Sequence, residues 1–211
     1  VEVFPEPQAG YREYVRWQNS VITPQDVDAN IYIESPFAHP SVMMRRGWVY
    51  ADGPFPEDYE LWLRLHGKGK RMAKVPRVLL RWRDSAMRAS RTDPRYARGA
   101  FDHLRALYLS EDPRVRYARE LVIWGAGPLA RRRVRLLVHE GVRPTAWVDV
   151  DPLKIGRTIS GARIHAKEWL EGRDPKPFVL IYVTNHFARD RVIDFLTHRG
   201  YRAGVDFLGV G

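Results

Sequence analysis

Two adjacent carboxylates, Glu57 and Asp58, are the residues of this chain best placed to do chemistry. They open a predicted short helix, because Pro56 interrupts the preceding chain and Gly67 follows its last apolar residue. A carboxylate held at a rigid helix start can act as a general base. Acidic residues in a first helical turn are also favoured by the helix dipole. A purely structural role for the pair is therefore the alternative.

Several short elements must position this pair. Leu61, Trp62 and Leu65 are spaced to share one buried face of the helix, which predicts an amphipathic element. Residues 31–33 (Ile-Tyr-Ile) and 77–82 (Arg-Val-Leu-Leu-Arg-Trp) are predicted strands. Further helices are predicted over 11–17, from Thr23 onward, and over 96–109, and residues 84–96 form a polar, arginine-rich loop.

Four segments in this half of the chain carry a resemblance. They are 39–46 (H-P-S-V-M-M-R-R), 56–65 (P-E-D-Y-E-L-W-L-R-L), 75–85 (V-P-R-V-L-L-R-W-R-D-S) and 90–96 (S-R-T-D-P-R-Y). Their content and order closely resemble family 2 glycosyltransferases, the inverting enzymes of GT-A type. The resemblance implies that residues 1–117 are the acceptor-side half of such a catalytic domain.

The same resemblance implies roles for individual residues. Asp58 would take the proton from an acceptor hydroxyl in a single displacement, and Glu57 would hold Asp58 or bind acceptor hydroxyls. The residues near the sugar and the diphosphate of the nucleotide-sugar would be His39, Arg81, Trp82, Arg83, Arg88 and Arg91. For His39 a structural role, and for Trp82 packing at a strand end, remain the alternatives.

The metal motif of such enzymes has no clear counterpart here. Asp26 and Asp28 have the D-x-D spacing, but Thr23 and Pro24 predict that Asp26 caps a helix. No metal ligand is therefore assigned, although Mn²⁺ or Mg²⁺ and a nucleotide-sugar donor are expected in the intact enzyme. The chain is expected to be a C-terminal piece of that enzyme, inactive alone, with Met43, Met44 and Trp62 partly uncovered.

The pattern changes near residue 120. A strand over 121–124, a glycine turn over 125–130, a helix over 129–140 and a strand over 145–149 form a predicted βαβ unit. A strand over 178–183, a helix over 189–199 and a strand over 205–208 follow. The candidate residues for a bound nucleotide are Gly125, Gly127, Ala130 and Asp149.

This half resembles a second family. Residues 122–127, 148–156 and Gly161 are similar to the small Rossmann-like domain that precedes the β-helix of sugar N-acyltransferases. The resemblance implies either a nucleotide-sugar pocket or a retained fold without ligand. Ala130 replaces the third glycine and Pro128 offers no N–H to a phosphate, which disfavours an NAD-type nucleotide. Residues 118–211 are expected to fold as one three-layer domain after a charged linker.

Composition limits the class of protein and its location in the cell. The 211 residues carry a formal net charge of +10, include no cysteine, and contain 45% hydrophobic residues. A globular protein without disulfides follows. No apolar run approaches the length of a membrane span, so we expect a cytoplasmic protein, with peripheral attachment at the inner membrane face as the second option. The basic residues are spread along the chain without a nucleic-acid-binding module, which favours a solvated surface with some cations for diphosphate.

The predicted fold class is therefore α/β, with a partial GT-A half followed by a Rossmann-like domain. The predicted function is part of an inverting glycosyltransferase that moves a sugar to a glycan or another hydroxyl acceptor, in polysaccharide or glycoconjugate synthesis. A non-catalytic module that binds a nucleotide or a partner is the alternative. A dinucleotide-dependent oxidoreductase is a more remote one, because a Tyr/Lys or His catalytic pair is missing. The donor sugar, the acceptor and the oligomeric state are not fixed by the sequence.

Overall fold

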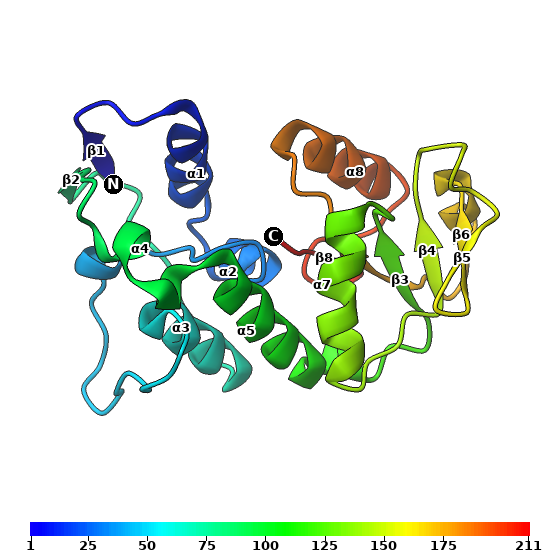
Figure 1. Cartoon of the computed structure of the whole chain (residues 1–211), viewed down its shortest axis with the longest axis horizontal. Coiled ribbons are helices and arrows are strands. Elements are labelled where there is room, and N and C mark those ends of the chain that lie inside the picture. The colour runs from blue at the N-terminus through cyan, green and yellow to red at the C-terminus, as the bar shows by residue number, and fades with distance from the viewer. The chain divides into compact units, whose positions relative to one another are not determined.

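The computed structural model describes residues 1–211 as a mixed α/β protein (Figure 1). The chain divides into two compact units, Val1–Leu104 and Arg105–Gly211. The division falls within helix α5 (Arg98–Glu111). Residues 105–117 therefore belong to the second unit, whereas the sequence groups them with the first domain. None of the helices is both long and apolar enough to span a membrane.

The first unit is mainly helical. Its only sheet has two parallel strands, β1 (Glu2–Phe4) and β2 (Arg81–Arg83), with Val3 opposite Trp82. The helices are α1 (Ala9–Ser20), α2 (Pro24–Asn30), α3 (Glu57–Gly67), α4 (Ala89–Thr92) and the first part of α5, with short 3₁₀ helices η1 (His39–Ser41) and η2 (Pro94–Tyr96).

Helix α2 begins as its sequence predicts. The Thr23 side chain accepts a hydrogen bond from the Asp26 amide at 3.1 Å, and the Asp26 carboxylate accepts one from the Thr23 amide at 2.8 Å. Pro24 occupies the first helical position, where its missing N–H costs nothing. This reciprocal capping box accounts for Asp26 without a metal.

The predicted strand over residues 31–33 is wrong. These residues form a turn that continues α2, since the Ile31 amide donates to the Val27 carbonyl and the Ile33 amide to the Asn30 carbonyl, both at 2.9 Å. All three side chains are buried. Burial against other helices and loops, rather than sheet pairing, explains why the segment is apolar.

The strand predicted over residues 77–82 is mostly wrong as well. Only Arg81 and Trp82 of that range join the sheet, because β1 is three residues long and offers no further partner. Val78 and Leu79 are largely exposed. The apolar residues of this segment therefore do not form a core strand.

Helix α3 is buried on more than one face. The prediction that Leu61, Trp62 and Leu65 are buried is confirmed. Tyr59 and Leu63 are buried too, so the helix is not amphipathic in the simple sense that the sequence predicts. Trp62 is 2% exposed, which also overturns the expectation that it is partly uncovered.

The second unit is built on a six-stranded sheet in the order β5-β6-β4-β3-β7-β8. All neighbouring pairs are parallel except β5 with β6. The sequence predicts four of these strands and misses the short pair β5 and β6. The bounds are Leu121–Trp124 (β3), Ala146–Val148 (β4), Thr158–Ile159 (β5), Ala162–His165 (β6), Phe178–Ile181 (β7) and Phe207–Gly209 (β8).

Helices cover the sheet on both faces. Alternate strand residues such as Val122 and Val179 share a core with Val192 and Leu196 of α8 (His186–His198). The β3–β4 connection through α7 (Pro128–His139) runs across the sheet in the opposite direction to the β7–β8 connection through α8. Right-handed crossovers therefore place α7 on the other face. The 3₁₀ helix η3 (Lys167–Leu170) lies between β6 and β7.

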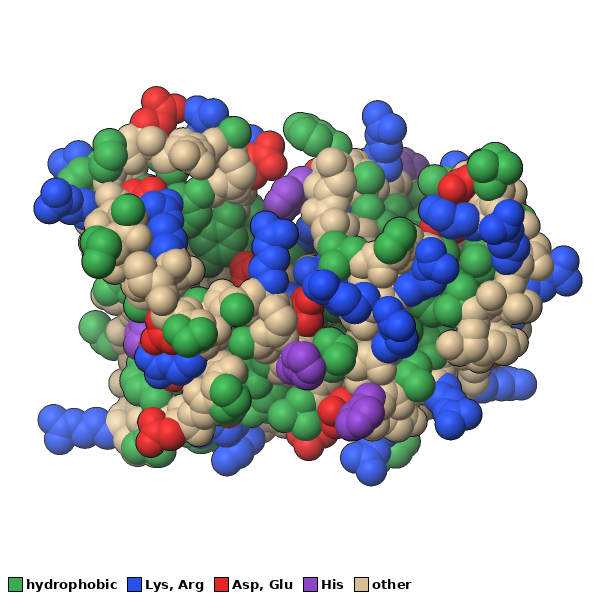
Figure 2. Space-filling model, in the orientation of Figure 1, with side chains coloured by type: hydrophobic (Ala, Val, Ile, Leu, Met, Phe, Trp, Pro, Cys, Tyr) green, Lys and Arg blue, Asp and Glu red, His purple; other side chains and the backbone are tan.

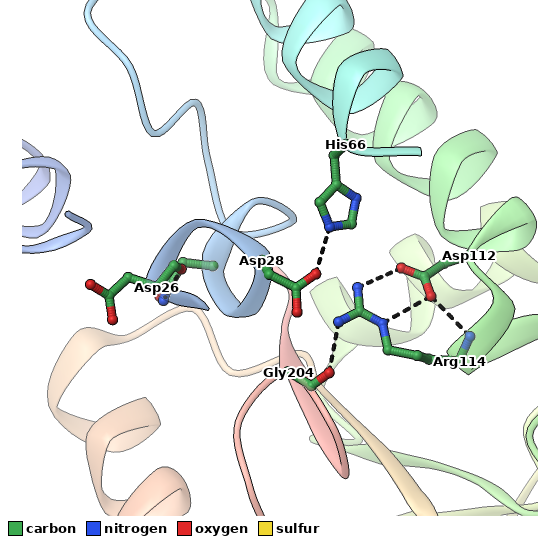
Figure 3. A network of polar contacts seen from close by, with 7 residues as sticks. Asp26, Asp28, His66, Asp112, Arg114 and Gly204 are labelled. Carbon is green, nitrogen blue, oxygen red and sulfur yellow. Dashed lines mark hydrogen bonds and ion pairs between the residues drawn. The ribbon is translucent and has the colours of Figure 1, made fainter. Parts of the chain in front are cut away.

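The segment predicted as a charged linker is an ordered part of the second unit. It contains α6 (Pro113–Arg116), which Asp112 caps by accepting the Arg114 amide at 2.9 Å. Figure 3 shows the Arg114 guanidinium between the Asp112 carboxylate and the Gly204 carbonyl, to which it donates at 2.7 Å. Val115 of the same helix is buried. The segment predicted as a linker is thus hydrogen-bonded, through Arg114, to the loop before β8.

A fragment of residues 105–211 should fold more stably than a fragment of residues 118–211. The shorter piece loses buried Val115 and the Arg114 bond to Gly204, for which we expect a loss of about 3 kcal/mol in unfolding free energy. Urea unfolding of both fragments measures this. Equal midpoints and slopes would show that residues 105–117 add nothing to the unit.

Candidate functional site

Asp58 is a buried carboxylate with one uncommitted oxygen. Its side chain lies in the first turn of α3, and the residue is 9% exposed. Oδ1 accepts the Tyr59 amide at 2.8 Å, whereas Oδ2 accepts no hydrogen bond from another side chain. Burial raises the pKa of Asp58, while the Tyr59 amide and nearby His39 act in the opposite direction. The arrangement leaves Oδ2 able to accept a proton.

Glu57 has two side-chain partners, although its Oε2 is buried without a hydrogen bond. Tyr96 donates its hydroxyl to Glu57 Oε1 at 3.0 Å, and Arg95 Nη1 lies 3.6 Å from Oε2. Arg95 is itself fixed by Asp93, 2.7 Å from Nη2. Burial raises the pKa of Tyr96, so its hydroxyl stays protonated and remains a donor. Glu57 thus contacts Tyr96 and Arg95, and none of these contacts joins it to Asp58.

His39 lies close enough to Asp58 to act on its pKa. Its Nε2 lies 2.7 Å from the Tyr50 hydroxyl, and its ring meets Trp62 edge-on at 6.4 Å between centroids. Burial raises the pKa of Tyr50, and the nearby charge of Asp58 acts in the same direction. The structure thus brings His39 near Asp58, as the resemblance implies, and adds Tyr50. No spacing rule points to Tyr50, because a turn-rich loop separates it from His39.

The arginines of residues 84–91 are engaged with protein groups. Arg88 Nη1 donates to the Tyr11 hydroxyl at 2.6 Å and to Asp84 at 3.1 Å, and Arg91 binds the second oxygen of Asp84 at 2.8 Å. The Arg88 guanidinium lies 4.3 Å from the centre of the Trp82 ring. These contacts favour packing for Trp82 and a loop-ordering role for both arginines.

Arg81 and Arg83 lie on the opposite side of β2 from Trp82, because side chains alternate along a strand. Both are exposed. Arg81 lies against Phe4, with its guanidinium carbon 5.4 Å from the ring centre, and 3.5 Å from Glu2. The three consecutive residues that the resemblance groups around the diphosphate therefore do not share one surface.

The D-x-D pair is occupied by other interactions. Besides the cap at Asp26, Asp28 Oδ1 lies 2.7 Å from Nε2 of His66, as Figure 3 shows. The His66 ring also meets Tyr32 edge-on at 5.8 Å. The chain has no group of three or more acidic, His or Cys residues arranged to hold a metal ion. These two aspartates do not fit the divalent metal that the resemblance implies.

The two glycines of the turn in the second unit differ. Gly125 is required by the backbone, whereas Gly127 has empty space where a side chain would lie. Gly125 has φ +110°, and a Cβ there would lie 3.3 Å from the Tyr182 carbonyl oxygen, so only glycine fits. Gly127 precedes α7 with an ordinary φ, and a Cβ there would meet nothing within 4 Å. Ala130, in place of the third glycine, is buried in α7. The open space lies at Gly127.

Asp149 accepts hydrogen bonds from the backbone on both sides of its own position in the fold, including the glycine turn. One oxygen accepts the Ala126 amide at 2.7 Å and the other accepts the Asp151 amide at 2.9 Å. Lys154 Nζ lies 3.3 Å from the same carboxylate. The residue is buried. A ribose hydroxyl would have to compete with these partners, so the contacts fit an NAD-type nucleotide poorly.

Lys and Arg side chains are scattered over the visible face of each unit and do not form a single patch (Figure 2). Many are committed to local ion pairs, such as Arg199 with Glu171 and Arg173 with Glu120. This distribution accords with a solvated surface.

Neither a family model nor a curated protein sequence matches this chain.

Replacing Asp58 by asparagine should stabilise the protein near neutral pH. Because burial raises the folded-state pKa of Asp58, its contribution to stability is present below the unfolded pKa of about 3.9 and is lost as pH rises through the folded value. Asp58→Asn removes that cost, so we expect about 1 kcal/mol more unfolding free energy at about pH 7. Urea unfolding should show the difference disappearing in acid.

Asp26→Asn is the matched control with the opposite sign. The Thr23 amide lowers the pKa of Asp26, so its stabilisation is present above the unfolded pKa and is lost as pH falls through the folded value. We expect a loss of about 0.5 kcal/mol near neutral pH. A destabilising Asp58→Asn under the same conditions would contradict our account of Asp58.

Proposed function

We propose that the first unit carries the acceptor side of an inverting glycosyl-transfer site, with Asp58 as the general base. The observation that carries the proposal is the Asp58 carboxylate, buried at a helix start with Oδ2 uncommitted. It occupies the second acidic position of the 56–65 segment that resembles family 2 glycosyltransferases. The burial of Asp58 at the helix start and the resemblance of the 56–65 segment together support the proposal.

In the proposed reaction, the acceptor hydroxyl oxygen attacks the anomeric carbon of the donor sugar. The bond from that carbon to the diphosphate oxygen breaks, and the nucleoside diphosphate leaves with the bonding electrons. The hydroxyl proton passes to Asp58 Oδ2. Burial raises the pKa of Asp58, and a raised pKa makes this carboxylate a stronger base.

The neighbouring residues have supporting parts in this proposal. Glu57, held by Tyr96 and Arg95, keeps the first turn of α3 in place. His39 and Tyr50 would contact hydroxyls of the acceptor or the donor sugar beside Asp58. Because Asp26 and Asp28 are engaged elsewhere, we assign no metal ligand and derive no step that uses a metal.

Asp58→Asn should lower turnover by about 100-fold or more while leaving the KM for the donor nearly unchanged, since only the proton acceptor is lost. The assay measures nucleoside diphosphate released from a panel of nucleotide-sugars, with Mn²⁺ or Mg²⁺ and hydroxyl acceptors. It uses the polypeptide as its gene encodes it. Asp52→Asn, which changes an exposed carboxylate of the preceding loop, is the control and should keep full activity. Near wild-type turnover for Asp58→Asn would refute the assignment.

We also infer a second candidate function, nucleotide or nucleotide-sugar binding by the second unit. The strand order of the sheet favours it. β3 and β7 are neighbours, and the chain leaves β3 toward β4 but leaves β7 in the opposite direction toward β8. Ligands of such sheets bind outside the carboxyl ends of the strands at that point. The open space at Gly127 is consistent with a ligand there, and Asp149 would be a structural residue instead of a ribose ligand.

Gly127→Trp should abolish such binding without unfolding the unit, because nothing lies within 4 Å of the added Cβ. Calorimetric titration with NAD and with nucleotide-sugars measures the affinity, and thermal unfolding checks the fold. We expect nucleotide-sugars to bind better than NAD, since Asp149 is already occupied. Binding that survives the substitution would place the site elsewhere.

A further inference from the structure

One exposed loop of the first unit combines apolar side chains with cations. The 42–50 loop (V-M-M-R-R-G-W-V-Y) joins η1 to the segment before α3. Met43 is 97% exposed and Val49 71%, and Met44 and Tyr50 are exposed as well. In Figure 1 it is the light-blue to cyan stretch that extends away before the chain returns into α3. Leaving these side chains in water is unfavourable.

The loop is anchored at its second end. Arg64 of α3 donates from Nη2 to the Val49 carbonyl at 2.7 Å, and the Tyr50 hydroxyl lies 2.7 Å from His39 Nε2. Gly47 has φ +98°, a conformation suited to glycine, and turns the chain between the methionines and Trp48. The methionines are therefore presented outward from a fixed base.

The cations of this region have no acidic partners. Arg45 and Arg46 lie in the loop and are exposed, and neither takes part in an ion pair within the protein. Lys68 and Lys70, just after α3, place their ammonium groups 5.6 and 5.8 Å from the centre of the Trp48 ring. They have no ion-pair partner either. Two of these four positive charges thus lie in the loop with the exposed apolar side chains, and two lie against its Trp48.

We propose that the 42–50 loop docks on an anionic lipid surface. Methionine and valine side chains gain by entering the boundary between headgroups and acyl chains. Lysine and arginine close to an anionic leaflet gain by electrostatic attraction, while their apolar stems lie along the surface. A nucleic acid would satisfy the same cations but leave Met43 and Met44 in water, so the combination favours lipid.

This docking does not rest on the proposed glycosyl transfer. Tyr50 ends the loop and contacts His39, so the lipid surface would lie beside the part of the unit that holds Asp58. Lipid binding is measured without any turnover. The two proposals therefore stand or fall separately.

The test is co-sedimentation of the whole chain with vesicles of phosphatidylcholine alone or mixed with phosphatidylglycerol. We expect binding to the mixed vesicles only, weakening with salt. Arg45→Gln combined with Arg46→Gln, and separately Met43→Ser combined with Met44→Ser, should each lower the affinity by about tenfold. All four positions are in an exposed loop, and circular dichroism should show unchanged folding.

Matched controls separate this surface from general stickiness. Met87→Ser changes a methionine that is 80% exposed, next to arginines already paired with Asp84, and should leave binding unchanged. Arg143→Gln combined with Arg191→Gln removes the same charge from the second unit and should also have little effect. Equal losses in these controls, loss only in the arginine variant, binding to neutral vesicles, or no binding at low salt would each overturn the proposal.

Discussion

Burial of helix α3 is the constraint on which the first unit depends. Tyr59, Leu61 and Leu63 are almost completely inaccessible, and the Tyr59 hydroxyl donates to the Ile31 carbonyl at 2.7 Å. That bond ties the helix to the turn after α2, while Phe37 meets the Trp62 ring at 5.5 Å. Because the elements of this unit are short, a single buried helix has to supply contacts on several sides. The first turn of α3 is carried into a low-dielectric environment together with its carboxylates.

This packing explains where the sequence predicts the first unit well and where it fails. The bounds of α3 and the cap of α2 depend on neighbouring residues, and both were predicted from Pro56, Thr23 and Pro24. The turn at 31–33 and the short strand β2 depend on which distant segments are available as partners. An apolar run such as Ile31–Ile33 is compatible with a strand or a buried turn, and only the tertiary structure decides between them.

In the candidate site, too, some residues could be predicted from the sequence and others depend on the tertiary structure. Asp58 and His39 were selected from the sequence, and the structure brings their side chains close enough for their charges to interact. Tyr50 and Tyr96 were not assigned, because each reaches the pair from a loop whose path has no periodic pattern. Arg88 and Arg91 were predicted to lie in a loop near the donor. Instead, Arg91 lies in α4, and both arginines pair with Asp84, a partner that composition does not reveal. Cations near a motif can order the protein as readily as bind a ligand.

In the second unit, four strands and both long helices follow from the alternation of buried runs and glycines, because parallel strands buried on both faces are continuously apolar. The role of Asp149 does not follow. Its spacing from the glycine turn is that of a ribose ligand, yet its oxygens are bonded to the Ala126 and Asp151 amides. Asp149 therefore does not leave its oxygens for a ligand. It accepts a hydrogen bond from the buried Ala126 amide of the turn. Each unit thus buries a carboxylate at the start or end of an element, and the two carboxylates differ in their hydrogen-bond partners. Asp149 offsets its burial with two amides and a lysine, whereas Asp58 receives one amide at Oδ1 and no protein hydrogen bond at Oδ2.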